Sequence, residues 1–111
     1  MFYVEKRLEI SAAHRLSLDY ESKCSTLHGH NWLVTVCCRS SELDQNGMVF
    51  DFTHIKKKVH GVLDHKCLND ILPCNPTAEN IAQWIAEQLG PKCWRVSVQE
   101  SEGNVAVWEA D

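Results

Sequence analysis

The amino-acid sequence predicts an α+β fold in which two helices pack on one face of an antiparallel four-stranded sheet, in the order ββααββ. Apolar residues alternate with polar ones in two segments near the start of the chain and in two near its end. Between these segments, apolar residues recur at helical spacing in two further stretches. Strands grouped on either side of a pair of helices are typical of α+β proteins. Because 111 residues supply one modest core, we expect residues 1–111 to form a single domain.

The first two strands are predicted over residues 2–14 and 28–39. The apolar face of the first contains Phe2, Val4, Leu8, Ile10 and Ala12, and His14 lies at the end of that face. One face of the second contains His28, His30, Trp32, Val34 and Val36. The segment LSLDYESKCST between the strands has no sustained period, so we predict a loop.

The two predicted helices follow turn and capping signals. After the turn sequence DQNG at 44–47, a first helix is indicated by Phe52, Ile55, Val59, Val62 and Leu63. The segment LDHKCLND is predicted as the end of this helix and a loop. A second helix begins at NPTAEN, with Asn75 or Thr77 as its N-cap, and ends at Gly90-Pro91. Its apolar positions are Ala78, Ile81, Ala82, Ile85, Ala86 and Leu89.

Two final strands are predicted in CWRVSVQE and VAVWEA, joined by a turn at SEGN. Glu100 continues the face formed by Trp94, Val96 and Val98, so its carboxylate points where apolar side chains point. A buried carboxylate without a partner is strongly destabilising. Glu100 therefore either binds a ligand with paired N–H donors or lies in water at the end of the strand.

The composition excludes several classes of protein. The net charge is −4 and no basic stripe is present, so we expect no nucleic-acid partner, and Lys56-Lys57-Lys58 is interpreted as a solvated helix face. No segment has the length of a membrane span, so no membrane partner is expected. Charges at residues 5–7 interrupt the first apolar segment, which argues against a signal peptide. Six cysteines without an export signal indicate reduced thiols and a cytoplasmic location.

Three histidines are candidate metal ligands. His28 and His30 lie two residues apart in a strand, so both imidazoles project from the same face. His14 ends a strand that a long hairpin can place beside them. Three neutral nitrogen ligands are typical of catalytic zinc, with a fourth position left for water or substrate. The alternative is a pair of partly exposed histidines at a strand start. We expect Gly29 to let the backbone bend or approach closely in this crowded region.

Cys24 and the Asp64-His65 dipeptide are the other chemistry-bearing residues. Cys24 is interpreted as a fourth ligand of a closed structural site, as a nucleophile or base beside the metal, or as a small buried side chain. A carboxylate hydrogen-bonded to an imidazole fixes the tautomer and raises the basicity of the ring, as a proton-transferring histidine requires. Asp64-His65 can form such a pair at the helix end, although the dipeptide is also frequent by chance.

Six segments resemble the 6-pyruvoyl-tetrahydropterin synthase/6-carboxytetrahydropterin synthase family. They are AAHRL at 12–16, C…HGHN at 24–31, GMVFDF at 47–52, LDHKCLN at 63–69, NPTAENIA at 75–82 and VQES at 98–101. The segments occur in the family's order and span nearly the whole chain. The resemblance implies the tunnelling fold (T-fold), in which subunits join their sheets into a barrel. It also implies a homo-oligomer, a hexamer built from two trimers, with active sites at subunit interfaces.

The resemblance also implies roles for individual residues. The ligands of Zn²⁺ would be His14, His28 and His30. Cys24 would be the catalytic thiol, and Asp64 and His65 would be the proton-transfer pair. The residues that bind the pterin ring would be Glu100, Thr77 and Glu79. Candidates to bind the phosphate groups of the substrate are Arg15, Lys23 and Lys66.

The substrate implied by the resemblance is 7,8-dihydroneopterin triphosphate. Three residues separate Cys24 from His28, a spacing more similar to the bacterial 6-carboxy branch, which releases acetaldehyde and triphosphate on the path to queuosine. The alternatives are a 6-pyruvoyl-tetrahydropterin synthase, which only eliminates triphosphate, and a non-catalytic zinc- or pterin-binding module. Ile10 and Trp32 depart from the family pattern. Both keep apolar bulk, but Trp32 lacks the hydroxyl of the usual tyrosine.

Overall fold

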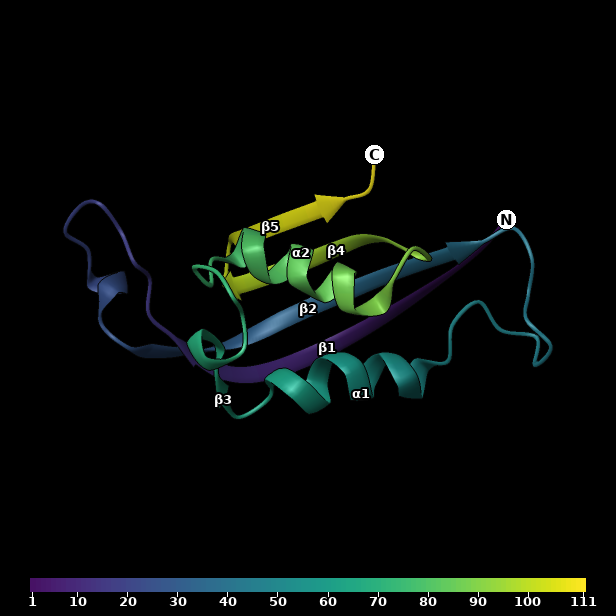
Figure 1. The fold of residues 1–111 in the computed structure, drawn as a ribbon, viewed down its shortest axis with the longest axis horizontal. Coiled ribbons are helices and arrows are strands. Elements are labelled where there is room, and N and C mark those ends of the chain that lie inside the picture. Colours follow the sequence, from purple (N-terminus) through teal and green to yellow (C-terminus); the bar gives the residue numbers. More distant parts are fainter.

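The computed structural model describes residues 1–111 and has the predicted α+β architecture. The strands are β1 (Phe2–His14), β2 (His28–Ser40), β3 (Lys66–Cys67), β4 (Cys93–Ser101) and β5 (Asn104–Glu109). The helices are α1 (Phe52–Leu63) and α2 (Ala78–Leu89), and two short 3₁₀ turns are η1 (Lys23–Ser25) and η2 (Leu68–Asp70). All five strands form one sheet in the order β3-β1-β2-β4-β5, which can be followed in Figure 1.

The sheet has five strands where the sequence predicted four. The additional strand, β3, lies in LDHKCLND and pairs in parallel with Ala12 and Ala13 of β1, so the sheet is mixed rather than purely antiparallel. A two-residue strand is too short to show an alternating pattern, which is why the sequence indicated a loop. His65 turns the chain into this pairing with a φ of 58°, and its N–H donates to the carbonyl of Ser11 at 2.7 Å.

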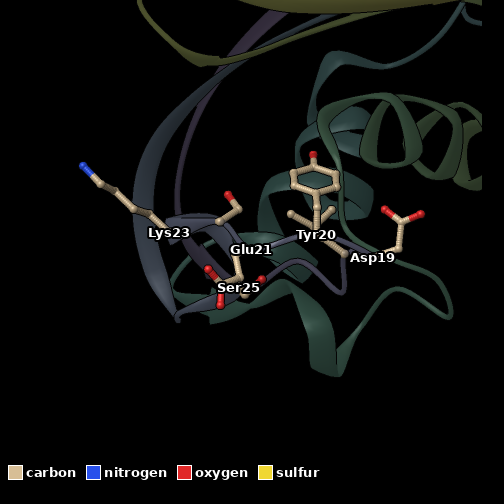
Figure 2. Close-up of a pocket in the computed structure, with 7 residues that line it drawn as sticks. Asp19, Tyr20, Glu21, Lys23 and Ser25 are labelled. Carbon is tan, nitrogen blue, oxygen red and sulfur yellow. The ribbon is translucent and has the colours of Figure 1, made fainter.

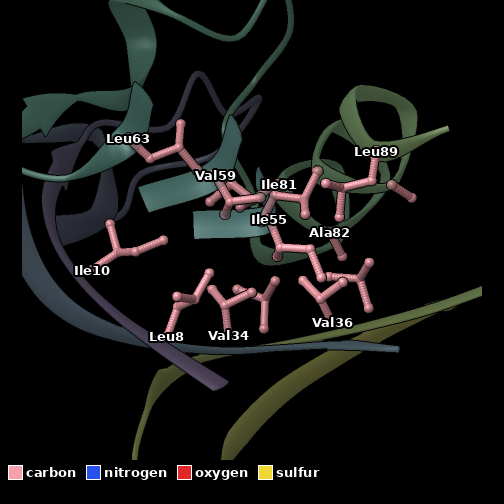
Figure 3. Packing of buried hydrophobic residues seen from close by; sticks show 14 of the residues in the cluster. Leu8, Ile10, Val34, Val36, Ile55, Val59, Leu63, Ile81, Ala82 and Leu89 are labelled. Atoms are coloured by element: carbon pink, nitrogen blue, oxygen red, sulfur yellow. The ribbon is translucent and has the colours of Figure 1, made fainter. Parts of the chain in front are cut away.

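One face of the sheet is covered by both helices and forms the core. Figure 3 shows side chains of α1 and α2 facing those of β1 and β2 across this layer. The buried side chains include Leu8, Ile10, Val34, Val36, Val96 and Val98 from the strands and Ile55, Val59, Leu63, Ile81, Ala82, Ile85, Ala86 and Leu89 from the helices. Phe52 and Val62, predicted on the apolar face of α1, are instead exposed, because the buried stripe of this helix is narrow.

Both helices begin at capping side chains. The Asp51 carboxylate accepts the N–H of Thr53 at 2.8 Å at the start of α1. Of the two residues predicted as the cap of α2, Thr77 is the cap, and its hydroxyl accepts the N–H of Asn80 at 3.1 Å. Gly90, with a φ of 88°, ends this helix. The start of α2 is therefore fixed directly after Pro76, whose carbonyl has a role in the site described below.

The opposite face of the sheet is open. Leu33 on β2 and Val105 and Val107 on β5 lie in exposed positions on this face. The two outer strands, β3 and β5, each have a neighbour on one side only. Exposed apolar side chains and free strand edges of this kind are suited to self-association. Neither helix is long and apolar enough to cross a membrane.

Replacing Ile55 with alanine is expected to lower the free energy of unfolding by about 2 to 5 kcal/mol. Ile55 is fully buried in α1, so the shorter side chain leaves a cavity in the core. The measurement is urea unfolding at fixed protein concentration, followed by circular dichroism. Lys57→Ala, on the exposed side of the same helix, is the matched control and should change the value by no more than about 0.5 kcal/mol. Equal losses in the two variants would contradict this account of the core.

Candidate metal site and its surroundings

Three imidazoles converge at one end of the core face. His14 and His28 are directly opposite each other in the β1–β2 register, and His30 follows two residues later on β2. The ring centroids of the three histidines are 4.6 to 5.3 Å apart. One possible ligand atom from each ring, together with a carboxylate oxygen of Glu100, lies within 4.8 Å of the others. The strand pairing therefore brings the three predicted metal ligands to one place and adds Glu100 to them.

Two of the rings are oriented by backbone carbonyl groups. Nδ1 of His14 donates a hydrogen bond to the carbonyl of Pro76 at 2.8 Å. Nδ1 of His28 donates to the carbonyl of Thr26 at 2.6 Å. Because a carbonyl oxygen can only accept, these bonds place the proton of each neutral ring on Nδ1 and leave the lone pair on Nε2. Metal-binding histidines are commonly oriented in this way by their second nitrogen.

The environment of His14 favours its neutral form. Its side chain is fully buried, and this burial is the largest influence on its pKa, which it lowers below the ordinary value. The nearby rings of His28 and His30 act in the same direction, whereas the hydrogen bond to Pro76 and the charge of Glu100 oppose it. A neutral ring has a nitrogen lone pair available, as a metal ligand requires.

Trp32 packs beneath two of the candidate ligands. Its ring centroid lies 4.9 Å from that of His14 and 5.1 Å from that of His30, both in edge-to-face contact. Its indole N–H donates to the carbonyl of Ala12 at 3.1 Å. The tryptophan is 2% exposed. Its indole N–H forms this hydrogen bond at a position where the family usually has a tyrosine hydroxyl. Ile10, the second departure from the family pattern, is fully buried in the core.

The donor atoms of this cluster fit a divalent transition metal. Oε1 of Glu100 lies 3.2 Å from Nε2 of His14 and 3.1 Å from Nε2 of His30, and neither nitrogen has a hydrogen bond. The lone pair on Nε2 of His14 repels the carboxylate oxygen that faces it unless a cation lies between them. Imidazole and carboxylate are both ligands of Zn²⁺. The carboxylate thus faces the cluster, and the alternative that it lies in water at a frayed strand end is wrong.

Asp64 and His65 form a hydrogen-bonded pair at the end of α1. Nδ1 of His65 lies 2.7 Å from Oδ2 of Asp64, and Oδ1 of Asp64 accepts the N–H of Ser11 at 2.9 Å. Since the N–H of His65 also donates to the Ser11 carbonyl, the pair is attached to β1 at two points. Nε2 of His60 lies 3.4 Å from Oδ2 of Asp64. Sequence reasoning missed His60, although its spacing of four residues from Asp64 on a helix is the signal that could have found it.

Asp64→Asn is expected to remove a pH-dependent part of the stability. The N–H of Ser11 and then the His65 imidazole hold the pKa of the Asp64 carboxyl below its ordinary value. A depressed pKa contributes stability above the unfolded-state value, about 3.9, and this contribution is lost as the pH falls through the folded-state pKa. The measurement is urea unfolding of wild type and variant between pH 6 and pH 3.

The unfolding free energies of the two proteins should differ at pH 6, and the difference should shrink as the pH falls below about 4 toward the lowered pKa of Asp64. Asp44 and Asp51 also have lowered pKa values, but both are present in either protein, so their effects cancel in the difference. Asp19→Asn, which removes an exposed carboxylate without a hydrogen bond, is the matched control. A difference between wild type and Asp64→Asn that does not change with pH would contradict the prediction.

Cys24 lies apart from both groups of residues. It is in η1, within the β1–β2 loop that projects beyond the sheet in Figure 1. The Ser22 hydroxyl accepts its N–H at 3.1 Å, and its carbonyl accepts the N–H of Leu16 at 2.8 Å. The partly exposed thiol is not among the clustered metal-ligand candidates and has no hydrogen bond to Asp64 or His65. The fold of this chain therefore does not bring the three proton-transfer candidates together.

The loop around Cys24 forms an open hollow of about 940 Å³, lined by residues 18–23 and Ser25. Figure 2 shows the side chains of Asp19, Tyr20 and Lys23 extending from it in different directions. Lys23 is a predicted phosphate-binding residue. The hollow also contains the carboxylates of Asp19 and Glu21, which repel phosphate. This hollow is therefore poorly suited to a triphosphate group.

Lys66 lines a second hollow of about 520 Å³ together with His65, Cys67 and residues 11–13 and 29–31. This surface combines a cation with the imidazole of the Asp64–His65 pair. Gly29 does not make the close approach expected of it, because a Cβ atom there would lie 3.8 Å from the carbonyl oxygen of Ala12, an ordinary contact. Arg15, the third candidate for phosphate binding, is exposed at the end of β1 and its side chain has no ion pair.

Thr77 and Glu79, the other predicted pterin-binding residues, lie at the start of α2. Thr77 caps this helix, and Glu79 is exposed in its first turn. Pro76 precedes Thr77 directly and accepts the hydrogen bond from His14. The beginning of α2 therefore adjoins the histidine cluster.

Two asparagines that sequence reasoning did not assign to the site hold this region to β1. The side-chain amide of Asn69 pairs with the backbone N–H and carbonyl of Arg15, both at 2.9 Å. The amide of Asn75 pairs in the same way with Ser17, at 2.9 and 3.0 Å. These contacts continue the edge of β1 beyond His14. Asn75, predicted as a possible helix cap, serves this purpose instead.

Comparison with protein families and with characterised relatives gives one consistent result. The family model described as 6-pyruvoyl tetrahydropterin synthase matches residues 3–111. A 6-carboxy-5,6,7,8-tetrahydropterin synthase of Bacillus subtilis is 32% identical over 123 residues, covering 96% of this chain and 84% of the relative. A protein of the same name from Synechocystis is 39% identical over 98 residues, covering 80% and 75%.

Two further comparisons extend the range of activities among similar proteins. A dihydroneopterin monophosphate aldolase of Pyrococcus furiosus is 40% identical over 86 residues, covering 75% of this chain and 70% of that protein. Among solved structures, the 6-pyruvoyl tetrahydropterin synthase of Caenorhabditis elegans superposes with a TM-score of 0.77 at 27% identity. This superposition covers 99% of the present chain and 96% of the other.

Proposed function

Because this chain belongs to the 6-pyruvoyl tetrahydropterin synthase family, we propose that it converts 7,8-dihydroneopterin triphosphate to 6-carboxy-5,6,7,8-tetrahydropterin, with release of acetaldehyde and triphosphate. The observation that carries the proposal is the convergence of three imidazoles, two of them oriented by carbonyl groups so that Nε2 faces the cluster. The relatives named 6-carboxy-5,6,7,8-tetrahydropterin synthase support this choice of product. The corresponding pathway is queuosine biosynthesis.

In the proposed site, His14, His28 and His30 hold Zn²⁺. A bound zinc ion supplies a Lewis acid that polarises oxygen atoms of the substrate side chain and so acidifies the adjoining C–H bonds. The buried, neutral state of His14 preserves the lone pair needed for binding. Trp32 restricts the movement of the His14 and His30 rings by packing against both.

Cys24 and the Asp64–His65 pair move protons at the side-chain carbons of the substrate. The bond from Nδ1 of His65 to Asp64 leaves Nε2 as the nitrogen that accepts or returns a proton. Cys24 acts as the second proton-transfer group. Because one subunit does not connect Cys24 with His65, we place the complete site at an interface of a homo-oligomer.

The pterin ring is bound through Glu100, aided by Thr77 and Glu79. A carboxylate accepts two N–H bonds from the amino-amide edge of the ring. For the assembly we propose a hexamer of two trimers, in which the open sheet face and the strand edges of neighbouring subunits meet. Residues 1–111 would act as one domain of this assembly. The free cysteines, one of them needed as a thiol, favour a reducing cytoplasm.

The experiment that tests the function supplies dihydroneopterin triphosphate to the zinc-loaded protein and assays acetaldehyde and triphosphate. Release of both, together with a carboxylated pterin, is the expected result. The second candidate is a 6-pyruvoyl-tetrahydropterin synthase, favoured by the structural similarity to the C. elegans enzyme, and it would release triphosphate without acetaldehyde. Aldol cleavage of dihydroneopterin monophosphate, suggested by the P. furiosus relative, is tested in a parallel assay with that substrate. Either of these outcomes would overturn the proposal.

A further inference from the structure

Glu100 lies at an irregular point of the sheet. Gln99 pairs with Val105 and Ser101 pairs with Asn104, so Glu100 has no partner in the β4–β5 register. The pairing of β2 with β4 also ends at Gln99. An unpaired residue of this kind forms a β-bulge, which redirects a side chain and is frequent beside active sites. Glu100 is thus released from the pairing that holds its neighbours, and its carboxylate faces the histidine cluster.

The Glu100 carboxylate has no hydrogen-bond donor within the protein. Two ring nitrogens lie at ion-pair distance from its Oε1 atom: Nε2 of His14 at 3.2 Å and Nε2 of His30 at 3.1 Å. Both nitrogens are buried without a hydrogen bond, and the side chain of Glu100 is only 27% exposed. A carboxylate in such surroundings requires either a cation or a set of N–H donors from outside the chain.

A cation and a set of N–H donors can each be the partner of this carboxylate, one after the other. We propose that Glu100 is an exchangeable ligand, which binds the metal ion when no pterin is present and releases it when a pterin takes the carboxylate. This inference rests on the proposed function, in which Glu100 anchors the pterin ring. A carboxylate that accepts two N–H bonds from a pterin cannot also direct the same oxygen toward a cation among the imidazoles. Pterin binding thereby leaves one coordination position of the metal open.

The exchange couples the binding of metal to the binding of pterin. If both compete for Glu100, each lowers the affinity of the other by the same factor. Unsubstituted pterin (2-amino-4-oxopteridine) has no side-chain oxygen with which to compensate at the metal, so it reports this competition directly. It should bind the metal-free protein more tightly than the metal-loaded protein. Independent sites would give equal affinities.

The test uses the protein loaded with Co²⁺, whose visible absorption reports the ligands of the metal. Titration with unsubstituted pterin should change this absorption, because one carboxylate oxygen leaves the ion. Glu100→Gln should lower metal affinity by about 10- to 100-fold, as expected when a carboxylate partner of a metal site is lost. Pterin should no longer change the cobalt spectrum of this variant. Glu102→Gln, an exposed residue in the following turn, is the matched control and should behave as wild type.

The experiment measures metal binding and pterin binding and requires no turnover. Its outcomes therefore distinguish failure of the exchange from failure of the proposed function. Pterin that binds, as followed by its fluorescence, without altering the wild-type cobalt spectrum would overturn the exchange and leave the proposed function standing. Equal metal affinities of wild type and Glu100→Gln would also overturn it. If pterin does not bind at all, the proposed function fails and the exchange fails with it. Circular dichroism checks the folding of Glu100→Gln. If this variant does not fold, the titration of the wild-type protein still tests the exchange.

Discussion

Replacing Cys24 with alanine is expected to lower turnover by about 10²- to 10⁴-fold, the usual contribution of a positioned proton-transfer group, while the metal stays bound. The thiol is not among the clustered ligand candidates, so its removal leaves all four of them in place. The backbone contacts of η1 use the N–H and carbonyl of residue 24, which alanine also provides. The measurements are steady-state kinetics with dihydroneopterin triphosphate and metal content of the purified variant.

Cys74→Ala is the control for the Cys24 experiment, because Cys74 is an exposed free cysteine that belongs to neither group of candidate residues. This variant should keep wild-type turnover. Loss of metal from Cys24→Ala would instead identify the cysteine as a structural ligand and favour a non-catalytic binding module. Wild-type turnover in Cys24→Ala would remove the thiol from the mechanism.

Replacing His30 with alanine should lower metal affinity by more than about 100-fold, beyond the effect of losing an outer-shell partner, and abolish turnover. His30 is the better choice for this test because its side chain is 22% exposed, whereas that of His14 is fully buried and its removal would leave a cavity in the core. The measurement is metal affinity by competition with a chelating dye.

His54→Ala provides the control for the His30 experiment, since His54 is an exposed histidine on α1 outside the cluster. Circular dichroism confirms that each variant is folded before metal is measured. Full metal affinity in folded His30→Ala would show that the ion binds elsewhere. It would remove the basis of the proposed site.

Much of the fold was predictable because repeating patterns report burial. The bounds of β1 agree with the prediction, and the apolar stripe of α2 identified five of its buried residues. The pattern failed where an element is too short to repeat, as in β3, or where the buried stripe is narrow, as in α1. The cap of α2 was ambiguous because Asn75 and Thr77 both have side chains that suit a helix cap, and only the contacts of the folded chain assign the cap to Thr77 and pair Asn75 with Ser17.

The parts of the candidate site that follow from side-chain chemistry and strand register were predictable. Spacing within β2 placed His28 and His30 on one face, and antiparallel pairing brought His14 opposite. The carbonyl groups of Thr26 and Pro76 that orient two of the rings were not predictable, since every residue has a carbonyl group. Strand alternation placed Glu100 on the face of Val96 and Val98, but it did not reveal the bulge at this residue. Neither spacing nor strand register relates Cys24, in the loop between β1 and β2, to His65 at the end of α1.

The bond between His14 and the carbonyl of Pro76 joins residues that are 62 positions apart. Such a contact exists only when the first strand and the second helix are both in place, so the denatured ensemble has no counterpart of this centre. A metal ion that binds there binds the native state and not the unfolded state, so it shifts the folding equilibrium toward the native state by mass action. Chelators should therefore act on this molecule as mild denaturants, with a melting temperature that falls as free metal is withdrawn.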